Sequence, residues 1–126
     1  MYQFLNLHPK KKIVGDCVKR ALSLLEGRSY EEVSLDLNRL KKETGAKTFN
    51  ENLNWKEYVS RRKWRKLSFP AVQGEDRMNG ERFCKIYPKG KYLLRMAHHV
   101  TAVVDGVIYD TFDCSWKCVY NAWQVK

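Results

Sequence analysis

Two apolar runs joined by Asp105-Gly106 limit the fold more than any other feature of this chain. The runs cover residues 99–104 and 107–110, and both are rich in branched residues that favour strands. Asp-Gly between such runs favours a two-residue type I′ turn, in which both central residues have positive φ. The pattern therefore predicts an antiparallel β-hairpin. Residues 91–96 and 119–123 have similar strand character, so we expect all four strands to form one antiparallel sheet.

The first half of the chain instead repeats its apolar residues at the spacing of an α-helix. Residues 17–26 place four apolar side chains at i, i+3, i+4 and i+7, with Asp16 in the N-cap position and Gly27 just past the end. This spacing predicts a helix over residues 17–26 with one buried face.

A second predicted helix follows at once. Ser29 and Glu32 form the S-x-x-E capping box that marks a helix start, and Gly45 is typical of a helix end. A third helix is predicted over residues 55–63. Helices followed by strands indicate the α+β class, with N-terminal helices packed on a C-terminal antiparallel sheet.

Two segments show neither the helical nor the strand spacing of apolar residues. Residues 1–15 are expected to form an extended leader, and residues 71–85 a loop around Gly74 and Gly80. The chain has 126 residues, which fits a single domain over 1–126. It lacks both the run of about 20 apolar residues that a membrane-spanning helix needs and the pattern of a secretory signal. We therefore expect a soluble cytoplasmic protein that does not bind membranes.

The chain is strongly basic. It carries 24 Lys and Arg against 14 Asp and Glu, a formal charge of +10, which favours an acidic or phosphate-bearing partner. A run around Trp64 would suit nucleic acid, but no nucleic-acid motif accompanies it. We favour the solvated face of a helix with Trp64 turned into the core. The run comprises Arg61, Arg62, Lys63, Arg65 and Lys66.

Three of the four cysteines are expected to be free buried thiols rather than ligands or disulfide partners. Structural zinc sites usually show two closely spaced ligand pairs, and only Cys114 and Cys118 form such a pair. A zinc site from these two with Cys84 and His98 is the alternative, which we do not favour. No metal is predicted.

The remaining cysteine, Cys17, lies in the first turn of a predicted helix, where the helix dipole stabilises a thiolate. His98 and His99 begin a predicted strand, and Asp110 ends the strand paired with it. A nucleophile at a helix start, a base on a strand and an orienting carboxylate on the next strand match the Cys–His–Asp arrangement of nucleophilic catalysis.

Two blocks that include these residues resemble a known family. Residues 15–23 and 27–33 are similar to the start of small papain-like cysteine peptidase proteins of bacteria and their phages. Residues 88–95 and 99–113 resemble the histidine strand and the Asn/Asp strand of the same fold, which bacteriocin-processing peptidase domains share more distantly. The blocks cover about half of the chain and include both ends of the predicted site.

The resemblance implies a papain-like fold, a bacterial or phage origin and a role for each site residue. Cys17 would be the nucleophile, His99 the general base and Asp110 the group that orients the imidazole. His99 is preferred to His98 because the family histidine directly precedes the apolar strand. Asp113 is the reserve for Asp110. The implied reaction is hydrolysis of a peptide, isopeptide or thioester bond in a peptide or protein substrate, with no cofactor.

The sequence departs from the family at one position. Papain-like peptidases have a glutamine six residues before the cysteine that helps to bind the oxyanion, and here that residue is Lys11. Lys11, Gln3, Asn6 or the backbone N–H of Cys17 are the candidate replacements. Loss of one oxyanion donor typically lowers the rate by ~10²–10³. The alternative function is therefore a non-enzymatic basic protein, on a retired peptidase fold, that binds nucleic acid or an acidic host protein.

Overall fold

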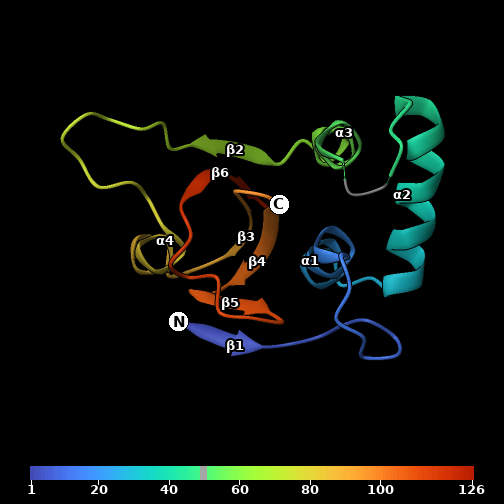
Figure 1. Ribbon diagram of the computed structural model, residues 1–126, viewed down its shortest axis with the longest axis horizontal. Helices are drawn as coiled ribbons and strands as arrows, with labels where there is room; N and C mark the ends of the chain where they lie inside the picture. The colour runs from blue at the N-terminus through green and yellow to red at the C-terminus, as the bar shows by residue number, and fades with distance from the viewer. Residues whose placement is uncertain (49–50) are drawn as a thin grey trace.

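The computed structural model describes residues 1–48 and 51–126. A six-stranded sheet lies between a layer formed by α1, α2 and α3 and the single helix α4 (Figure 1). This arrangement confirms the α+β class. The elements in chain order are β1 (Tyr2–Phe4), α1 (Cys17–Glu26), α2 (Tyr30–Thr44), α3 (Asn52–Arg62), β2 (Arg65–Ser68), α4 (Gly80–Ile86), β3 (Lys91–Met96), β4 (His99–Val104), β5 (Val107–Asp110) and β6 (Val119–Gln124).

The strand order is β1-β5-β4-β3-β6-β2. The predicted hairpin is present, with φ of 48° at Asp105 and 75° at Gly106, and with Val104 opposite Val107. The four predicted strands pair antiparallel as expected, but the sheet as a whole is mixed, because β1 pairs in parallel with β5. This strand comes from the predicted leader, and it places the N-terminal segment beside the strand that carries Asp110.

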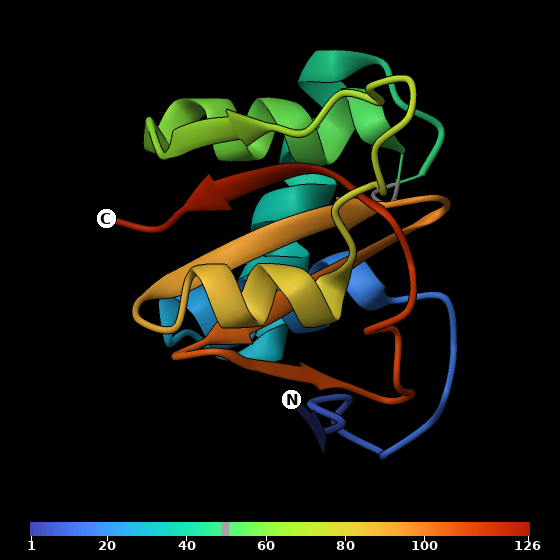
Figure 2. The same ribbon diagram turned by 90° about the vertical axis from the view of Figure 1, so that its left-hand side faces the viewer.

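The sheet buries side chains on both faces, because successive residues of a strand point to opposite sides. On β3, Leu93 packs with the three-helix layer and Leu94 with α4. Trp55 from α3 meets Trp123 from β6 edge to face in the first core, with ring centroids 5.3 Å apart. Figure 2 looks onto the α4 side, where this short helix crosses in front of the strands.

The predicted helices are confirmed, but their starts are only partly explained. α1 has the predicted bounds, and Gly27 ends it in the left-handed conformation. Ser29 accepts a hydrogen bond from the Glu32 backbone N–H at 3.1 Å, as the capping box requires. The side chain of Asp16 does not cap α1; its carboxylate binds elsewhere.

The stretch between α2 and β3 differs most from the prediction. α3 begins at Asn52, three residues before the predicted start, and β2 was not predicted. Gly80–Ile86 form α4 instead of a loop, and the Asn79 side chain caps it by accepting from the Arg82 N–H at 2.8 Å. Among residues 1–48 and 51–126, no helix has the length and apolar character needed to cross a membrane.

Candidate active site

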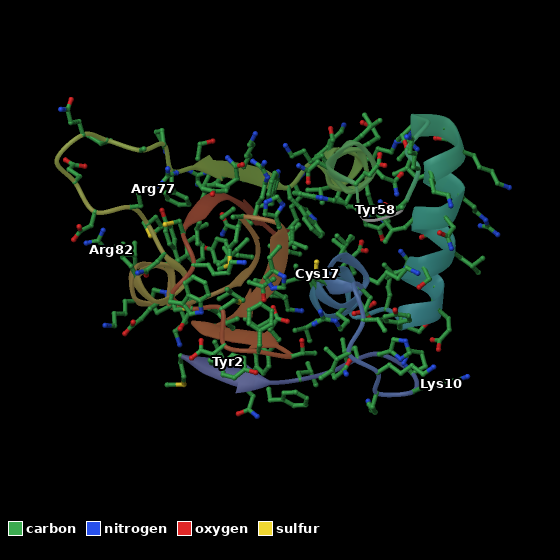
Figure 3. The ribbon with its side chains drawn as sticks, in the orientation of Figure 1. Tyr2, Lys10, Cys17, Tyr58, Arg77 and Arg82 are labelled. Carbon is green, nitrogen blue, oxygen red and sulfur yellow. The ribbon has the colours of Figure 1, made fainter. Side chains whose placement is uncertain are left out.

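Cys17 is the first residue of α1, where the helix faces the ends of β3 and β4. Figure 3 shows its side chain on the side of α1 that is toward the sheet. The residue is half-buried. The first N–H groups of a helix have no acceptor within the helix, so negative charge is stabilised at this position.

His99 and Asp110 meet on neighbouring strands. His99 begins β4 and Asp110 ends β5, and the His99 Nε2 atom lies 2.6 Å from Asp110 Oδ2. Only 7% of the His99 side chain and 2% of the Asp110 side chain are exposed. Because Nε2 is bound to the carboxylate, Nδ1 is the ring nitrogen left to interact with the Cys17 thiol.

Four other groups hold the Asp110 carboxylate in place. The Thr101 hydroxyl donates to Oδ2 at 2.6 Å, and the buried Cys114 thiol contacts the same oxygen at 3.7 Å. Arg20 donates to Oδ1 at 2.9 Å, and the Thr111 backbone N–H donates to it at 2.7 Å. Both oxygens are therefore fixed, so the carboxylate has one orientation toward His99.

Arg20 connects this carboxylate to a second buried acid. Its Nε donates to Asp16 Oδ1 at 2.7 Å, and the Tyr30 hydroxyl donates to the other Asp16 oxygen at 2.9 Å. Only 10% of the Arg20 side chain is exposed. Asp16, which was predicted as a helix cap, instead anchors a chain of contacts that runs from Tyr30 to His99.

These contacts change the pKa values of the three central residues. Burial raises the pKa of the Cys17 thiol. Hydrogen bonds from the His99 ring and the Val100 backbone, together with the positive charges of His99 and Arg20, lower it by more than burial raises it. The net pKa is therefore below its ordinary value. Burial lowers the pKa of His99, but hydrogen bonds with Asp110 and with the thiols of Cys114 and Cys17 raise it to about 11. Burial raises the pKa of Asp110, and the bonds from His99, Thr101 and Arg20 outweigh that effect and lower it. The set therefore favours a thiolate beside an imidazolium.

Cys17 and His99 line an open cavity of about 530 Å³. Its walls come from the turn between β3 and β4, from the start of α3 and from β6. The other lining residues are Val18, Glu51, Asn52, Trp55, Arg95, Met96, Ala97, His98, Val100 and Tyr120. A substrate can therefore reach the thiol from solvent.

The three side chains suggested for the oxyanion do not line this cavity. Lys11 Nζ donates to the Asn6 backbone carbonyl at 3.0 Å, and Asn6 Nδ2 donates to the Lys12 carbonyl at 3.0 Å. Gln3 is exposed on β1 and donates to the Phe4 carbonyl at 3.4 Å. Of the candidate donors, only the backbone N–H of Cys17 belongs to a cavity residue.

The alternatives for the base and the orienting acid lie elsewhere. His98 is exposed in the turn before β4, with a left-handed φ of 53°, and reaches the cavity rim. Asp113 is exposed, and its Oδ1 accepts from the Ser115 N–H at 3.0 Å. Asp113 thus serves the turn that follows β5, while His99 and Asp110 bind each other.

The four cysteines are free thiols. In the part of the chain that the structure describes, one group of side chains has metal-ligand spacing: His99, Asp110 and Cys114, with ligand atoms within 4.8 Å of one another. The zinc alternative named Cys84, His98, Cys114 and Cys118, and of these four only Cys114 belongs to this group. Hydrogen-bond donors already hold both Asp110 oxygens, which opposes its use as a metal ligand.

The basic run is divided between two elements. Arg61 binds Glu43 and Glu57, and Arg62 binds Glu26 at 2.8 Å. Lys63 ends α3, while Arg65 and Lys66 lie exposed on β2. The prediction that the run forms one helix face was wrong, because α3 ends before Trp64, but Trp64 packs against the core as expected.

Sequence reasoning missed Arg20, Thr101 and Arg95. Thr101 follows His99 by two residues on a predicted strand, so the alternation of side chains along a strand predicts that both lie on the same face. Arg20 has only the i,i+4 spacing from Asp16 as a local signal, and its other partner, Asp110, lies 90 residues away. Compared with protein-family models, curated proteins and solved structures, the chain shows no significant match.

Proposed function

We propose that this protein is a papain-like cysteine hydrolase that cleaves a peptide, isopeptide or thioester bond. The observation that carries the proposal is the buried His99–Asp110 pair at 2.6 Å, whose free ring nitrogen serves a thiol of lowered pKa in an open cavity. The order of cysteine, histidine and aspartate along the chain, and the blocks around them, support the papain-like family as part of this proposal.

In the proposed reaction, the Cys17 thiolate attacks the carbonyl carbon and the carbonyl electrons move to oxygen. The backbone N–H of Cys17 donates to that oxyanion. The His99 imidazolium then gives its proton to the leaving amine or thiolate as the bond breaks, which leaves a thioester on Cys17. Water attacks the thioester, His99 takes its proton, and the acid is released with the thiolate restored.

Asp110 keeps the imidazole oriented and stabilises its positive charge throughout this cycle. The residues needed for each proton transfer are present in the chain, and the proposed reaction uses no metal or organic cofactor. The basic-run alternative is less well supported, because Arg61 and Arg62 already bind carboxylates of the protein itself.

The proposal is tested by alkylating the protein with iodoacetamide between pH 5 and 10 and assigning each cysteine by mass spectrometry. Cys118 is also half-buried and serves as the internal control. At pH 6 we expect Cys17 to react at least about tenfold faster than Cys118, because only the thiolate attacks. His99→Ala should remove this advantage.

A peptide library and a denatured protein substrate then test turnover. Cys17→Ala should abolish cleavage and keep the fold, whereas Cys118→Ala should retain cleavage. A Cys17 that reacts like Cys118 at every pH would contradict the proposed function and leave the binding alternative as the better explanation.

A further inference from the structure

One side chain in the cavity wall carries a charge that the proposed reaction does not use. Arg95 lies on β3 two residues after Leu93, on the side of the sheet that faces α1 and α3. It is half-buried and lines the same cavity as Cys17. Its positive charge therefore faces the space that a substrate would occupy.

Arg95 differs in its partners from the other arginines that are not exposed. Arg20, Arg28 and Arg62 each lie within 4 Å of a carboxylate, but no carboxylate in residues 1–48 and 51–126 pairs with Arg95. Its Nη1 donates to the Asn121 amide oxygen at 3.2 Å, and its guanidinium lies 5.6 Å from the centroid of the Tyr120 ring. A guanidinium has five N–H donors, so these neutral contacts hold the group and leave most of its donors for a ligand.

The neighbouring charges strengthen the positive field. Burial lowers the pKa of Lys56, and the positive charges of Arg95 and Lys66 lower it further, so both charges act on the position of Lys56. Glu51 is the acidic residue among those that line the cavity. Its Oε1 accepts from the Lys47 backbone N–H at 3.2 Å, and it forms no ion pair with Arg95 in the part of the chain that the structure describes.

We propose that Arg95 forms a subsite for a carboxylate of the substrate, so that the enzyme prefers a peptide with an acidic group close to the scissile bond. Guanidinium binds carboxylate through paired hydrogen bonds, and a partly buried site strengthens the attraction. This inference rests on the proposed function, because the subsite acts on a substrate attacked by Cys17. The acidic group is either a side chain or a chain terminus, which share this chemistry.

Three iodoacetyl probes of one skeleton test the subsite. Iodoacetyl-glutamine amide is neutral, iodoacetyl-glutamate α-amide carries a side-chain carboxylate, and iodoacetyl-glutamine carries a terminal carboxylate. In each case the Cys17 sulfur forms a bond to the methylene carbon and iodide leaves. The rate of each acidic probe divided by that of the neutral probe measures recognition of the carboxylate separately from the reactivity of the thiol.

We expect Arg95→Met to lower the ratio of acidic-probe rate to neutral-probe rate at Cys17 by about three- to tenfold, the size typical of one partly exposed charge pair. Arg95→Gln should do the same with a hydrogen-bonding side chain, and Arg95→Lys should keep much of the ratio. Arg39→Met is the matched control, because it removes the same charge from an exposed position on α2 outside the cavity. The probe that loses more with Arg95→Met identifies the source of the carboxylate.

The two failures are distinguishable. If the neutral probe reacts at Cys17 no faster than at Cys118, the proposed function fails. If Cys17 is reactive but Arg95→Met and Arg95→Gln leave both ratios at the wild-type value, or change them no more than Arg39→Met does, the carboxylate subsite is overturned.

Discussion

At the scale of single residues, Arg20 links the two buried acids of the site. Its guanidinium lies between the buried carboxylates of Asp16 and Asp110 and is itself almost fully buried. After the hydrogen bonds and charge of His99 and the Val100 backbone bond, which outweigh burial, its positive charge also contributes to the lowered pKa of Cys17. We therefore regard Arg20 as a positioning residue, which acts on the nucleophile through the orienting acid and through its field.

Arg20→Met should accordingly raise the pKa of Cys17. The midpoint of the pH profile for iodoacetamide labelling should move upward, because the thiolate loses a nearby cation. The variant should also lose about 3–5 kcal/mol of folding free energy, the usual result of leaving buried carboxylates without their partner. Urea denaturation measures this loss.

Two variants separate the site effect from a general loss of stability. Arg20→Lys keeps the charge and should keep a labelling midpoint close to that of the wild type. Arg28→Met removes another ion-paired arginine, bound to Asp36 at 2.6 Å, and should leave the midpoint unchanged. An Arg20→Met protein that folds and labels with the wild-type midpoint would contradict the role given to Arg20.

At the scale of elements, α4 depends on a close approach at its first residue. A Cβ atom added to Gly80 would lie 3.0 Å from the Ser115 Cα and 3.0 Å from the Ile108 side chain. The Ser115 contact is a backbone atom, which cannot move away by rotation of a side chain. Gly80 therefore lets α4 pack against the segment that follows β5.

Gly80→Ala should lower the free energy of unfolding by about 1–3 kcal/mol, as overpacking of a core typically does. Urea denaturation measures the change. Gly15→Ala is the control, because an added Cβ there meets nothing within 4 Å and its φ is not positive. Equal stability of the two variants would show that the contact at Gly80 relaxes without cost.

The elements also show how far the sequence predicts this fold. The helix at 17–26 and the hairpin at 99–110 follow from local signals, namely a regular apolar period and the Asp-Gly turn. β1 and β2 are short edge strands with mostly exposed residues, so their strand character depends on pairing with β5 and β6 rather than on pattern. α4 is one of the shortest helices and begins at a glycine, which in isolation indicates a loop.

The site residues also differ in how far the sequence predicts them. Cys17, His99 and Asp110 each have a local signal, and the hairpin turn makes the last two neighbours, as their 2.6 Å contact confirms. The suggested oxyanion side chains were inferred from chain position alone, and all three instead bind backbone carbonyls of their own segment. Long-range charges such as those of Arg20 and Arg95 depend on packing between elements, which no single segment encodes.

At the scale of the whole molecule, the Cys17–His99 pair links the stability of the fold to pH. A thiolate beside an imidazolium carries one proton, and so does the unfolded chain between the ordinary pKa values of 6.5 for histidine and 9.0 for cysteine. Stability changes with pH only where the folded and unfolded chains bind different numbers of protons. Where the pH exceeds both 6.5 and the lowered pKa of Cys17, the pair should therefore make stability nearly independent of pH up to about 9.

Cys17→Ala should remove this balance. His99 still binds Asp110, so its pKa stays raised, and its contribution is complete below pH 6.5 and decreases as the pH rises toward the folded pKa. The free energy of unfolding should then fall by up to about 1.4 kcal/mol per pH unit above pH 6.5, the effect of one proton. Urea denaturation of the wild type, Cys17→Ala and the control Cys118→Ala at pH 6.5, 7.5 and 8.5 measures the slopes. If Cys17→Ala has the same slope as the wild type, the thiol and the imidazole of the folded protein do not form an ion pair.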